Sequence, residues 1–329
     1  MTHISRRSFV LTAATAGAAF GLDKAIEIIP SAHAQQGASP TTLNPKGLKF
    51  HRFKVGDIEV TQVLDATIER DHNPTFVKNA SVDDVKTPLK TAGLADEKVP
   101  NAYTVTIVKL GDRQIMFDSG NGLATGNPNF GHLAENAKAA GIDLSKLSAI
   151  IVTHFHPDHI YGLLTKENAQ VYANTPVIVP EAEYKYWADP ATIAALPEAR
   201  QGIPKRVQAT MPTWKNLTQH AGDKEVVPGV RAIPTHGHTP GHTSYHVASG
   251  SQQLIVLGDV TNIPAFNVRN PGWHLIVDQD AAIAEASRRR TFDRAVADKI
   301  MLTGYHWGMP GAGTLAKDGN GYVLTAVTT

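Results

Sequence analysis

Cysteine is absent from this chain of 329 residues. Disulfide bonds and thiolate metal ligands are therefore both excluded, and any bound metal must rest on histidine and aspartate. A G-x-S-x-G nucleophile elbow is also absent, so a serine hydrolase of that type is not predicted. The apolar run at 11–20 is too short to span a bilayer, and polar residues follow it closely.

The N-terminal segment carries the features of an export signal. Arg6 and Arg7 form a twin-arginine pattern, an alanine-rich apolar run follows, and Ala32-His33-Ala34 resembles a cleavage site. We expect export to the periplasm or the medium with cleavage after Ala34, and the alternative is an amphipathic helix or a membrane anchor. The predicted organisation is a signal peptide at 1–34, a loose linker at 35–50 and one domain at 51–329.

Neither basic nor acidic residues are in excess in this chain. The chain has 31 basic and 30 acidic residues, and the two balance once 1–34 is set aside. No basic field is available to hold nucleic acid, so a nucleic-acid partner is not predicted. With 42% hydrophobic and 19% charged residues, the composition is that of a globular protein with ample core.

Histidine, in contrast, is concentrated in one short stretch, 153–159. Three histidines and an aspartate occupy six positions there, directly after the strand-like apolar run 149–152. Imidazole and carboxylate together suit zinc and its neighbours. His154 and His156 project to the same side of an extended backbone. Pro157 suits the first turn of a helix and would aim Asp158 and His159 elsewhere, so one loop can serve two metals.

This stretch, Thr-His-Phe-His-Pro-Asp-His, resembles the T-H-x-H-x-D-H signature of the metallo-β-lactamase superfamily. The resemblance covers about residues 50–329 and is strongest towards the methyl parathion hydrolases, which are dinuclear organophosphate-cleaving enzymes. They share the H-G-H-T-P-G-H-T run, the aromatic pair Tyr186-Trp187 and the pattern at 309–313. The other superfamily motifs follow in order at 117–120, 237–243, 257–259 and 304–306.

The resemblance implies an α/β fold, the αβ/βα sandwich of two facing mixed β-sheets with helices on the outside. The pattern of the chain agrees with it. Alternating residues around Gly56-Asp57 and around Gly111-Asp112 predict two hairpins, and 280–298 is the longest helical pattern. The polar stretch 71–101 has weak structural signals apart from one possible helix near 82–92. It is predicted to be a binding lid or a plain surface excursion.

The resemblance also implies a set of metal ligands. One ion is expected on His154, His156 and His242, and the other on Asp158, His159 and His306. Asp259 is expected to bridge the two ions, and Asp118 to brace the ligand loop from behind. His236 and His238 match no ligand position and are expected to have supporting or structural roles.

Two divalent ions, with zinc expected, would share a hydroxide that attacks a carbonyl or phosphoryl centre. Asp158 could orient this nucleophile or pass its proton, and Asp259 would hold the ions in place, so both are predicted catalytic residues. Aromatic residues near the motifs could line the substrate pocket or could equally be core. These candidate substrate-binding residues are Trp187, Phe130, Trp307 and Phe266.

The predicted function is that of an exported dinuclear hydrolase of neutral esters, lactones or phosphotriesters. A neutral small-molecule substrate is favoured because no arginine or lysine cluster flanks the ligand motifs; Arg269 is the nearest candidate. The alternatives are a β-lactamase, a glyoxalase II-like thioesterase and a non-catalytic ligand-binding protein on the same fold. The resemblance also implies a homodimer.

Overall fold

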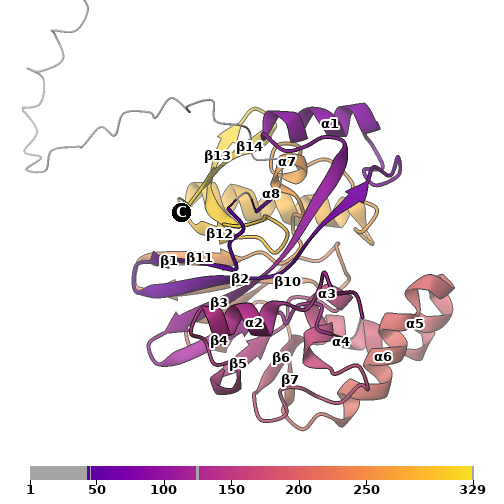
Figure 1. Cartoon of the computed structure of the whole chain (residues 1–329), viewed down its shortest axis with the longest axis vertical. Helices are drawn as coiled ribbons and strands as arrows, with labels where there is room; N and C mark the ends of the chain where they lie inside the picture. Colours follow the sequence, from indigo (N-terminus) through magenta and orange to yellow (C-terminus); the bar gives the residue numbers. More distant parts are fainter. Residues whose placement is uncertain (1–42, 45, 124–125, 328–329) are drawn as a thin grey trace, which may run out of the picture. The chain divides into compact units, whose positions relative to one another are not determined.

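Two seven-stranded mixed sheets form the frame of the domain (Figure 1). They are seen in a computed structural model that describes residues 43–44, 46–123 and 126–327. The predicted signal peptide and most of the predicted linker lie outside these residues, so export stays a prediction. Within the described part of the chain, no helix is long and apolar enough to cross a membrane.

The first sheet is antiparallel over its first four strands and parallel over the rest. In spatial order its strands are β1 (Phe50–Val55), β2 (Ile58–Asp71), β3 (Lys98–Leu110), β4 (Arg113–Phe117), β5 (Ala149–Ile151), β6 (Val177–Pro180) and β7 (Leu217–His220).

The second sheet is antiparallel except where β11 and β12 run parallel. In chain order its strands are β8 (Glu225–Val227), β9 (Val230–Pro234), β10 (Thr243–Ser249), β11 (Gln252–Val256), β12 (Met301–Thr303), β13 (Ala312–Asp318) and β14 (Gly321–Ala326).

Strand periodicity divides the apolar residues between two faces of each sheet. In β5, Ala149 and Ile151 belong to the core between the sheets, whereas Ile150 belongs to the core under the outer helices. In β11, Val256 faces the first of these cores and Ile255 the opposite face. Successive strand residues point to opposite faces, so near-continuous apolar runs fit strands that are buried on both sides.

Helices cover the outer faces. Over the first sheet, α2, α4 and α6 contribute to one apolar core, and α8 packs against the second sheet through Phe292 and Ala295 (Figure 1). The α-helices are α1 (Val82–Thr91), α2 (Leu133–Ala139), α3 (Pro157–Ile160), α4 (Glu181–Ala188), α5 (Pro190–Ala195), α6 (Gly202–Thr210), α7 (Pro264–Asn267) and α8 (Ala281–Ala297). Short 3₁₀ turns lie at Leu144–Lys146, Tyr161–Leu163, Glu198–Arg200 and Met211–Thr213.

This arrangement confirms the predicted αβ/βα sandwich. The stretch 71–101 differs in part from its prediction, because β2 and β3 continue through it as a long hairpin pair out to Asp71 and Lys98. The polar residues at the ends of both strands, such as Glu69, Arg70 and Lys98, gave no strand signal in the sequence. The remainder of the stretch holds α1, which begins at a Ser81–Asp84 capping box.

The strand order brings the motif loops together at one edge of the sandwich. The histidine-rich loop follows β5, Asp118 follows β4, Asp259 follows β11 and His306 follows β12. The carboxyl ends of neighbouring parallel strands meet at the same sheet edge. Residues far apart in sequence are thereby placed in one site.

A buried histidine ties the two sheets together and predicts a pH effect on stability. The Nε2 atom of His220 lies 2.9 Å from the Tyr245 hydroxyl, which donates to the Val152 carbonyl, while Nδ1 of His220 is buried without a partner. Burial, with a smaller contribution from Lys224, lowers the pKa of His220 to about 4. The unfolded chain binds this proton below pH 6.5, and the folded chain only near pH 4.

The free energy of unfolding should therefore contain a term from His220 that is fully present above pH 6.5. This term is lost as the pH falls towards 4, by roughly 2–3 kcal/mol. Replacing the residue by His220→Gln, which keeps a donor for Tyr245, should flatten this part of the pH profile. Urea unfolding between pH 4.5 and 7.5 measures the difference, with the exposed His132→Gln as control. Parallel profiles for the two variants would contradict the expectation.

Candidate metal centre

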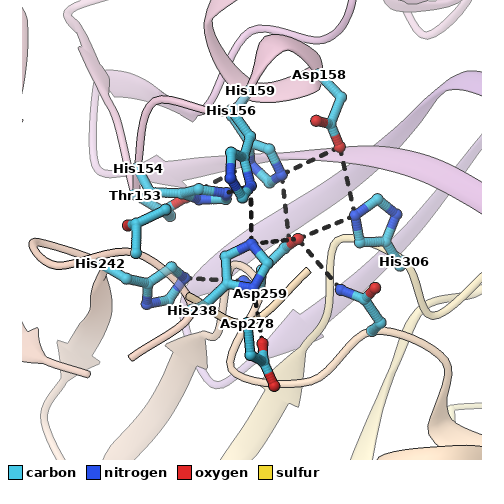
Figure 2. A network of polar contacts seen from close by, with 12 residues as sticks. Thr153, His154, His156, Asp158, His159, His238, His242, Asp259, Asp278 and His306 are labelled. Atoms are coloured by element: carbon cyan, nitrogen blue, oxygen red, sulfur yellow. Dashed lines mark hydrogen bonds and ion pairs between the residues drawn. The ribbon is translucent and has the colours of Figure 1, made fainter. Parts of the chain in front are cut away.

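Four ligand-type side chains converge in a first group, hereafter cluster 1: His154, His156, His238 and Asp259 (Figure 2). One potential ligand atom from each lies within 4.8 Å of the others. Nδ1 of His156 is 3.0 Å from Nε2 of His154 and 2.9 Å from Nε2 of His238. Ring nitrogens that face one another in this way can share a single proton or a cation, and three of them suit a zinc ion.

A second group, cluster 2, consists of Asp158, His159 and His306. Oδ2 of Asp158 lies 3.4 Å from Nε2 of both histidines. Asp259 stands between the clusters. Its Oδ1 is 3.2 Å from His159 Nε2, and its Oδ2 is 3.1 Å from His306 Nε2 and 3.3 Å from His238 Nε2. This geometry suits Asp259 to bridge two ions, and the bridging role that the family resemblance implies stays a prediction.

His242 is not a member of cluster 1, and its role as a metal ligand stays a prediction. Both of its ring nitrogens are engaged elsewhere: Nδ1 with the Thr235 hydroxyl at 2.9 Å, and Nε2 with the backbone N–H of Asp259 at 2.9 Å. His238, which was expected only to support the site, occupies the place in cluster 1 (Figure 2). His242 immediately precedes β10, and its two hydrogen bonds hold its ring at the start of that strand, whereas His238 lies within the loop.

Packing against two helices fixes this loop. Gly237 has φ +123°, and a Cβ there would collide with the α8 backbone at Ala284. A Cβ on Gly241 would collide with the α4 backbone at Glu183. Only glycine permits such close approach of two backbones. The loop is therefore clamped between α4 and α8, and this clamp directs His238 towards the other ligands.

Asp118 contacts both His159 of cluster 2 and the ligand loop. Its Oδ2 lies 2.8 Å from Nδ1 of His159, and its Oδ1 accepts a hydrogen bond of 2.7 Å from the Thr153 backbone N–H. A carboxylate on the far ring nitrogen fixes the orientation of a ligating imidazole. Burial raises the pKa of Asp118, and His159 opposes that shift.

His238 has a comparable support that the sequence did not reveal. Its Nδ1 lies 2.9 Å from Oδ1 of Asp278, whose Oδ2 accepts a 3.1 Å bond from Nη2 of Arg288. Arg288 is buried at 1% exposure and also donates to the carbonyls of Val260 and Pro271. Neither residue lies in a recognisable motif. A buried arginine position on α8 is visible only in the folded chain.

Glu183 of α4 joins the two ligand loops. Its Oε1 accepts from the Phe155 N–H at 2.8 Å and from the Trp187 indole N–H at 2.6 Å. Its Oε2 accepts from the Thr239 hydroxyl at 2.7 Å and from the Gly241 N–H at 2.9 Å. Burial raises the pKa of Glu183, and these four donors oppose the shift. One buried carboxylate thus sets the separation of the 154–159 and 235–242 loops.

The electrostatics of both clusters fit divalent cations. Burial, followed by the nearby His238, lowers the pKa of His156 to about 3, so its ring stays neutral with a free lone pair. In cluster 2, burial favours the neutral imidazole, but Asp259 and Asp158 outweigh it and raise the pKa of His306 to about 9. His159 Nε2 and Asp259 Oδ1 are both buried without a hydrogen-bond partner. The carboxylates favour a positive charge between these atoms, and a metal ion would provide it.

A cavity of about 260 Å³ opens over the clusters. His156, Asp158, His238, Asp259 and His306 form its floor. Asp158 keeps 19% of its side chain exposed, more than the 4% of Asp259, so Asp158 is the carboxylate that faces the substrate space. The wall residues are Arg70, Asn101, Tyr103, Asn121, Phe130, Pro157, Asn262 and Val277.

Of the four aromatic residues predicted to line the pocket, Phe130 does so and three are core residues. Trp187 is 2% exposed, donates its indole N–H to Glu183 and packs behind His156 with ring centroids 6.2 Å apart. Phe266 is buried between Phe76 and Trp273. Trp307 is buried in the core beneath α8. Sequence proximity to a motif does not determine whether a ring faces the cavity or the core.

The arginine that lines the cavity is not the one nearest to a ligand motif in the sequence. Arg269, the nearest arginine to a ligand motif in sequence, forms a salt bridge with Asp318 and is not among the cavity residues. Arg70 at the end of β2 lines the cavity instead. It lies more than 80 residues before the first ligand, and only strand pairing brings it to the site.

Curated proteins of known activity are similar in sequence to part of this chain. The chain is 29% identical over 151 residues to an N-acyl homoserine lactonase of a Bacillus species, covering 46% of this chain and 53% of that protein. It is 32% identical over 120 residues to the N-acyl homoserine lactonase of Bacillus cereus, covering 36% and 40%. The chain thus spans about half the length, or less, of these curated relatives.

Solved structures share the fold over most of both chains. AidC, a dizinc quorum-quenching lactonase, superposes with a TM-score of 0.75 at 24% identity, covering 85% of this chain and 98% of AidC. AbOPH, a hydrolase in the beta lactamase superfamily, superposes with a TM-score of 0.79 at 23% identity, covering 86% and 98%. At these identities the likeness establishes the fold alone.

The family is established by a match of the family model, which spans residues 99–296 and so more than half of the chain. This range runs from within β3 to within α8 and contains all but one of the residues in the two clusters; His306 lies beyond it. The ligand-type side chains, their place at the sheet edge and the two-sheet frame all agree with that match. The chain belongs to the metallo-beta-lactamase superfamily.

Proposed function

We propose that this protein is a metal-dependent hydrolase that opens lactone rings, with N-acyl homoserine lactones as its substrate class. The observation that carries the proposal is the convergence of clusters 1 and 2 on the floor of one cavity. Its volume of about 260 Å³ suits a small ring with its substituent. The curated relatives, which are N-acyl homoserine lactonases, support the choice of a lactone.

The residues of the two clusters fit two divalent ions, with zinc the best match to imidazole and carboxylate ligands. His154, His156 and His238 would hold one ion, Asp158, His159 and His306 the other, and Asp259 both. When bound, such ions supply a nucleophilic water near neutral pH and polarise the scissile carbonyl.

The side chains then have distinct tasks. Water adds to the lactone carbonyl carbon, the ring C–O bond breaks, and a proton passes from the water to the departing ring oxygen. Asp158 faces the cavity and can hold this proton at its carboxylate between the two events. Asp259 keeps the clusters at a fixed separation, and Asp118 with Asp278 keeps the imidazoles oriented.

A substrate panel tests the proposal. Zinc-replete protein should hydrolyse N-hexanoyl homoserine lactone with a higher kcat/KM than an aryl ester, a phosphotriester, a β-lactam or a glutathione thioester. Chelation should abolish hydrolysis, and added zinc should restore it. The chain has no cysteine, and no serine is among the described residues that line the cavity, so no side-chain nucleophile of either type is available there. Activity that survives chelation, or a preference for the β-lactam or the thioester, would contradict the proposal.

Phosphotriester hydrolysis stays a prediction, which the same panel measures. The family resemblance towards methyl parathion hydrolase motivates it, and the aromatic wall expected for an aryl leaving group is reduced to Phe130 and Tyr103 in the described cavity. We therefore place lactones first and phosphotriesters second. Comparable kcat/KM values for the two substrates would reverse that order without affecting the metal centre.

A further inference from the structure

The end of the β2–β3 strand pair near Asp71 and Lys98 forms one wall of the cavity. β3 pairs with β4 only from Thr106 to Leu110, whereas its pairing with β2 continues to the Asp71–Lys98 pair. Residues 98–105 therefore extend beyond the fourth strand. Val99 lies opposite Arg70 in the register, and Val99, Asn101 and Tyr103 share a strand face. This places Arg70, Asn101 and Tyr103 together on the cavity wall.

These three side chains form a hydrogen-bonded group around one oxygen. The Tyr103 hydroxyl oxygen accepts a bond of 2.5 Å from Nη2 of Arg70 and one of 3.1 Å from Nδ2 of Asn101. Its own proton must then point away from both donors. Among the described residues, no side chain or carbonyl accepts that proton. The remaining N–H groups of Arg70 and the O–H of Tyr103 are thus free hydrogen-bond donors.

The hydroxyl lies next to the reaction centre. The Tyr103 ring packs edge-to-face on the His306 ring, with centroids 5.2 Å apart, and on Phe130 at 5.3 Å. A phenol is protonated at neutral pH, so the Tyr103 hydroxyl can act as a donor. Tyr103 lines the same cavity as Asp158 and His306 of cluster 2.

We propose that Arg70 and Tyr103 form a donor subsite, which binds a neutral carbonyl acceptor on the substrate beside the scissile lactone. The proposal rests on the proposed function and specifies its substrate class: a lactone carrying an amide substituent. Two free donors select an acceptor group. Oδ1 of Asn101, which is buried without a hydrogen-bond partner, adds one acceptor beside them and can take a donor such as an amide N–H. A neutral acceptor is favoured over an anion because Arg70 is exposed, so its charge is screened, and the carboxylate of Asp158 lies on the floor opposite.

The test compares two lactones of similar length in Tyr103→Phe and Arg70→Gln. One is N-hexanoyl homoserine lactone, and the other is a γ-alkyl lactone without the amide. Tyr103→Phe keeps the ring packing on His306 and removes only the donor. It should lower kcat/KM for the amide-bearing lactone by roughly three- to tenfold, the effect of one neutral hydrogen bond. The alkyl lactone should change by less than about twofold, and Arg70→Gln should follow the same pattern.

Binding gives a readout that is independent of turnover. The N-hexanoyl lactam analogue, which keeps the amide and is not hydrolysed, should bind to the zinc-loaded Tyr103→Phe variant with a Kd raised by a similar factor. Lys109→Gln, an exposed change on the same strand, is the control, and metal content should be equal in all variants. If the wild-type protein opens no lactone, the proposed function is contradicted. Binding of the lactam analogue would still test the subsite in that case.

Two results would overturn the subsite. One is an equal loss for both lactones in Tyr103→Phe, which indicates a general effect on the centre. The other is stronger hydrolysis of a lactone whose substituent ends in a carboxylate, with that preference lost in Arg70→Gln. In that case the wall would select an anion and not a neutral carbonyl.

Discussion

His238→Ala is expected to reduce the bound metal from a pair of ions to one ion per chain and to lower kcat/KM by about 10²–10³-fold. The reason is that Nε2 of His238 completes cluster 1, within 2.9 Å of His156 Nδ1 and 3.3 Å of Asp259 Oδ2. Cluster 2 keeps all of its own members, so its ion should remain. Elemental analysis of replete, dialysed protein measures the ion count.

His242→Ala separates this assignment from the one that the sequence suggested. His242 bonds to Thr235 and to the Asp259 backbone, so its loss should lower the free energy of unfolding by about 1–3 kcal/mol and leave both ions in place. His246→Ala, a change on the neighbouring strand β10, serves as a control. An emptied first site in His242→Ala, with a full pair in His238→Ala, would restore the original assignment.

Glu183→Ala is expected to lower the free energy of unfolding by about 3–5 kcal/mol, the loss typical of removing one partner from a buried charged network. The carboxylate accepts four hydrogen bonds, two from groups in the ligand loops' backbone and two from side chains. Its removal leaves four donors buried without partners. Urea denaturation of the metal-free protein measures the change without interference from metal binding.

Glu181→Ala is the matched control on the same helix. Glu181 forms an exposed i,i+4 salt bridge with Lys185 at 2.8 Å, and such pairs contribute about 0.3–0.5 kcal/mol. Glu183→Gln should give an intermediate loss, because its amide oxygen can accept bonds while its NH₂ group faces two donors. A loss in Glu183→Ala no greater than that in Glu181→Ala would show that the loops hold their separation without this carboxylate.

The sequence by itself determined the chemistry of the centre and much of its placement. The absence of cysteine leaves only nitrogen and oxygen ligands. Six residues of the 154–159 loop suffice to aim two pairs of ligands in different directions, because the backbone changes from extended to helical at Pro157. The alternation of apolar residues predicted the hairpins and the buried strands. The ligand loop, the hairpins and the buried strands each depend on residues that are close together in the sequence. Local backbone geometry is therefore enough to predict them.

Neighbouring residues in the sequence do not show whether His238 or His242 lies in cluster 1. Both histidines lie in one glycine-containing loop, and both are buried. Gly237 packs closely on α8 and Gly241 on α4, so contacts with distant helices fix the path of this loop. The helices that impose this packing are separated from the loop by about 40 residues or more in the chain.

The tertiary structure alone also decided which side chains face the cavity. The sequence around an aromatic residue near a motif is the same whether its ring packs in the hydrophobic core or lines the cavity. The sequence therefore does not distinguish Phe130, which lines the cavity, from the buried Trp187, Trp307 and Phe266. Arg70 and Tyr103 reach the cavity through the pairing register of β2 and β3. Glu183 and Arg288 are buried charges whose partners come from distant loops. Such contacts form only when the two sheets and their outer helices have packed, because burial is what makes each of these partners necessary.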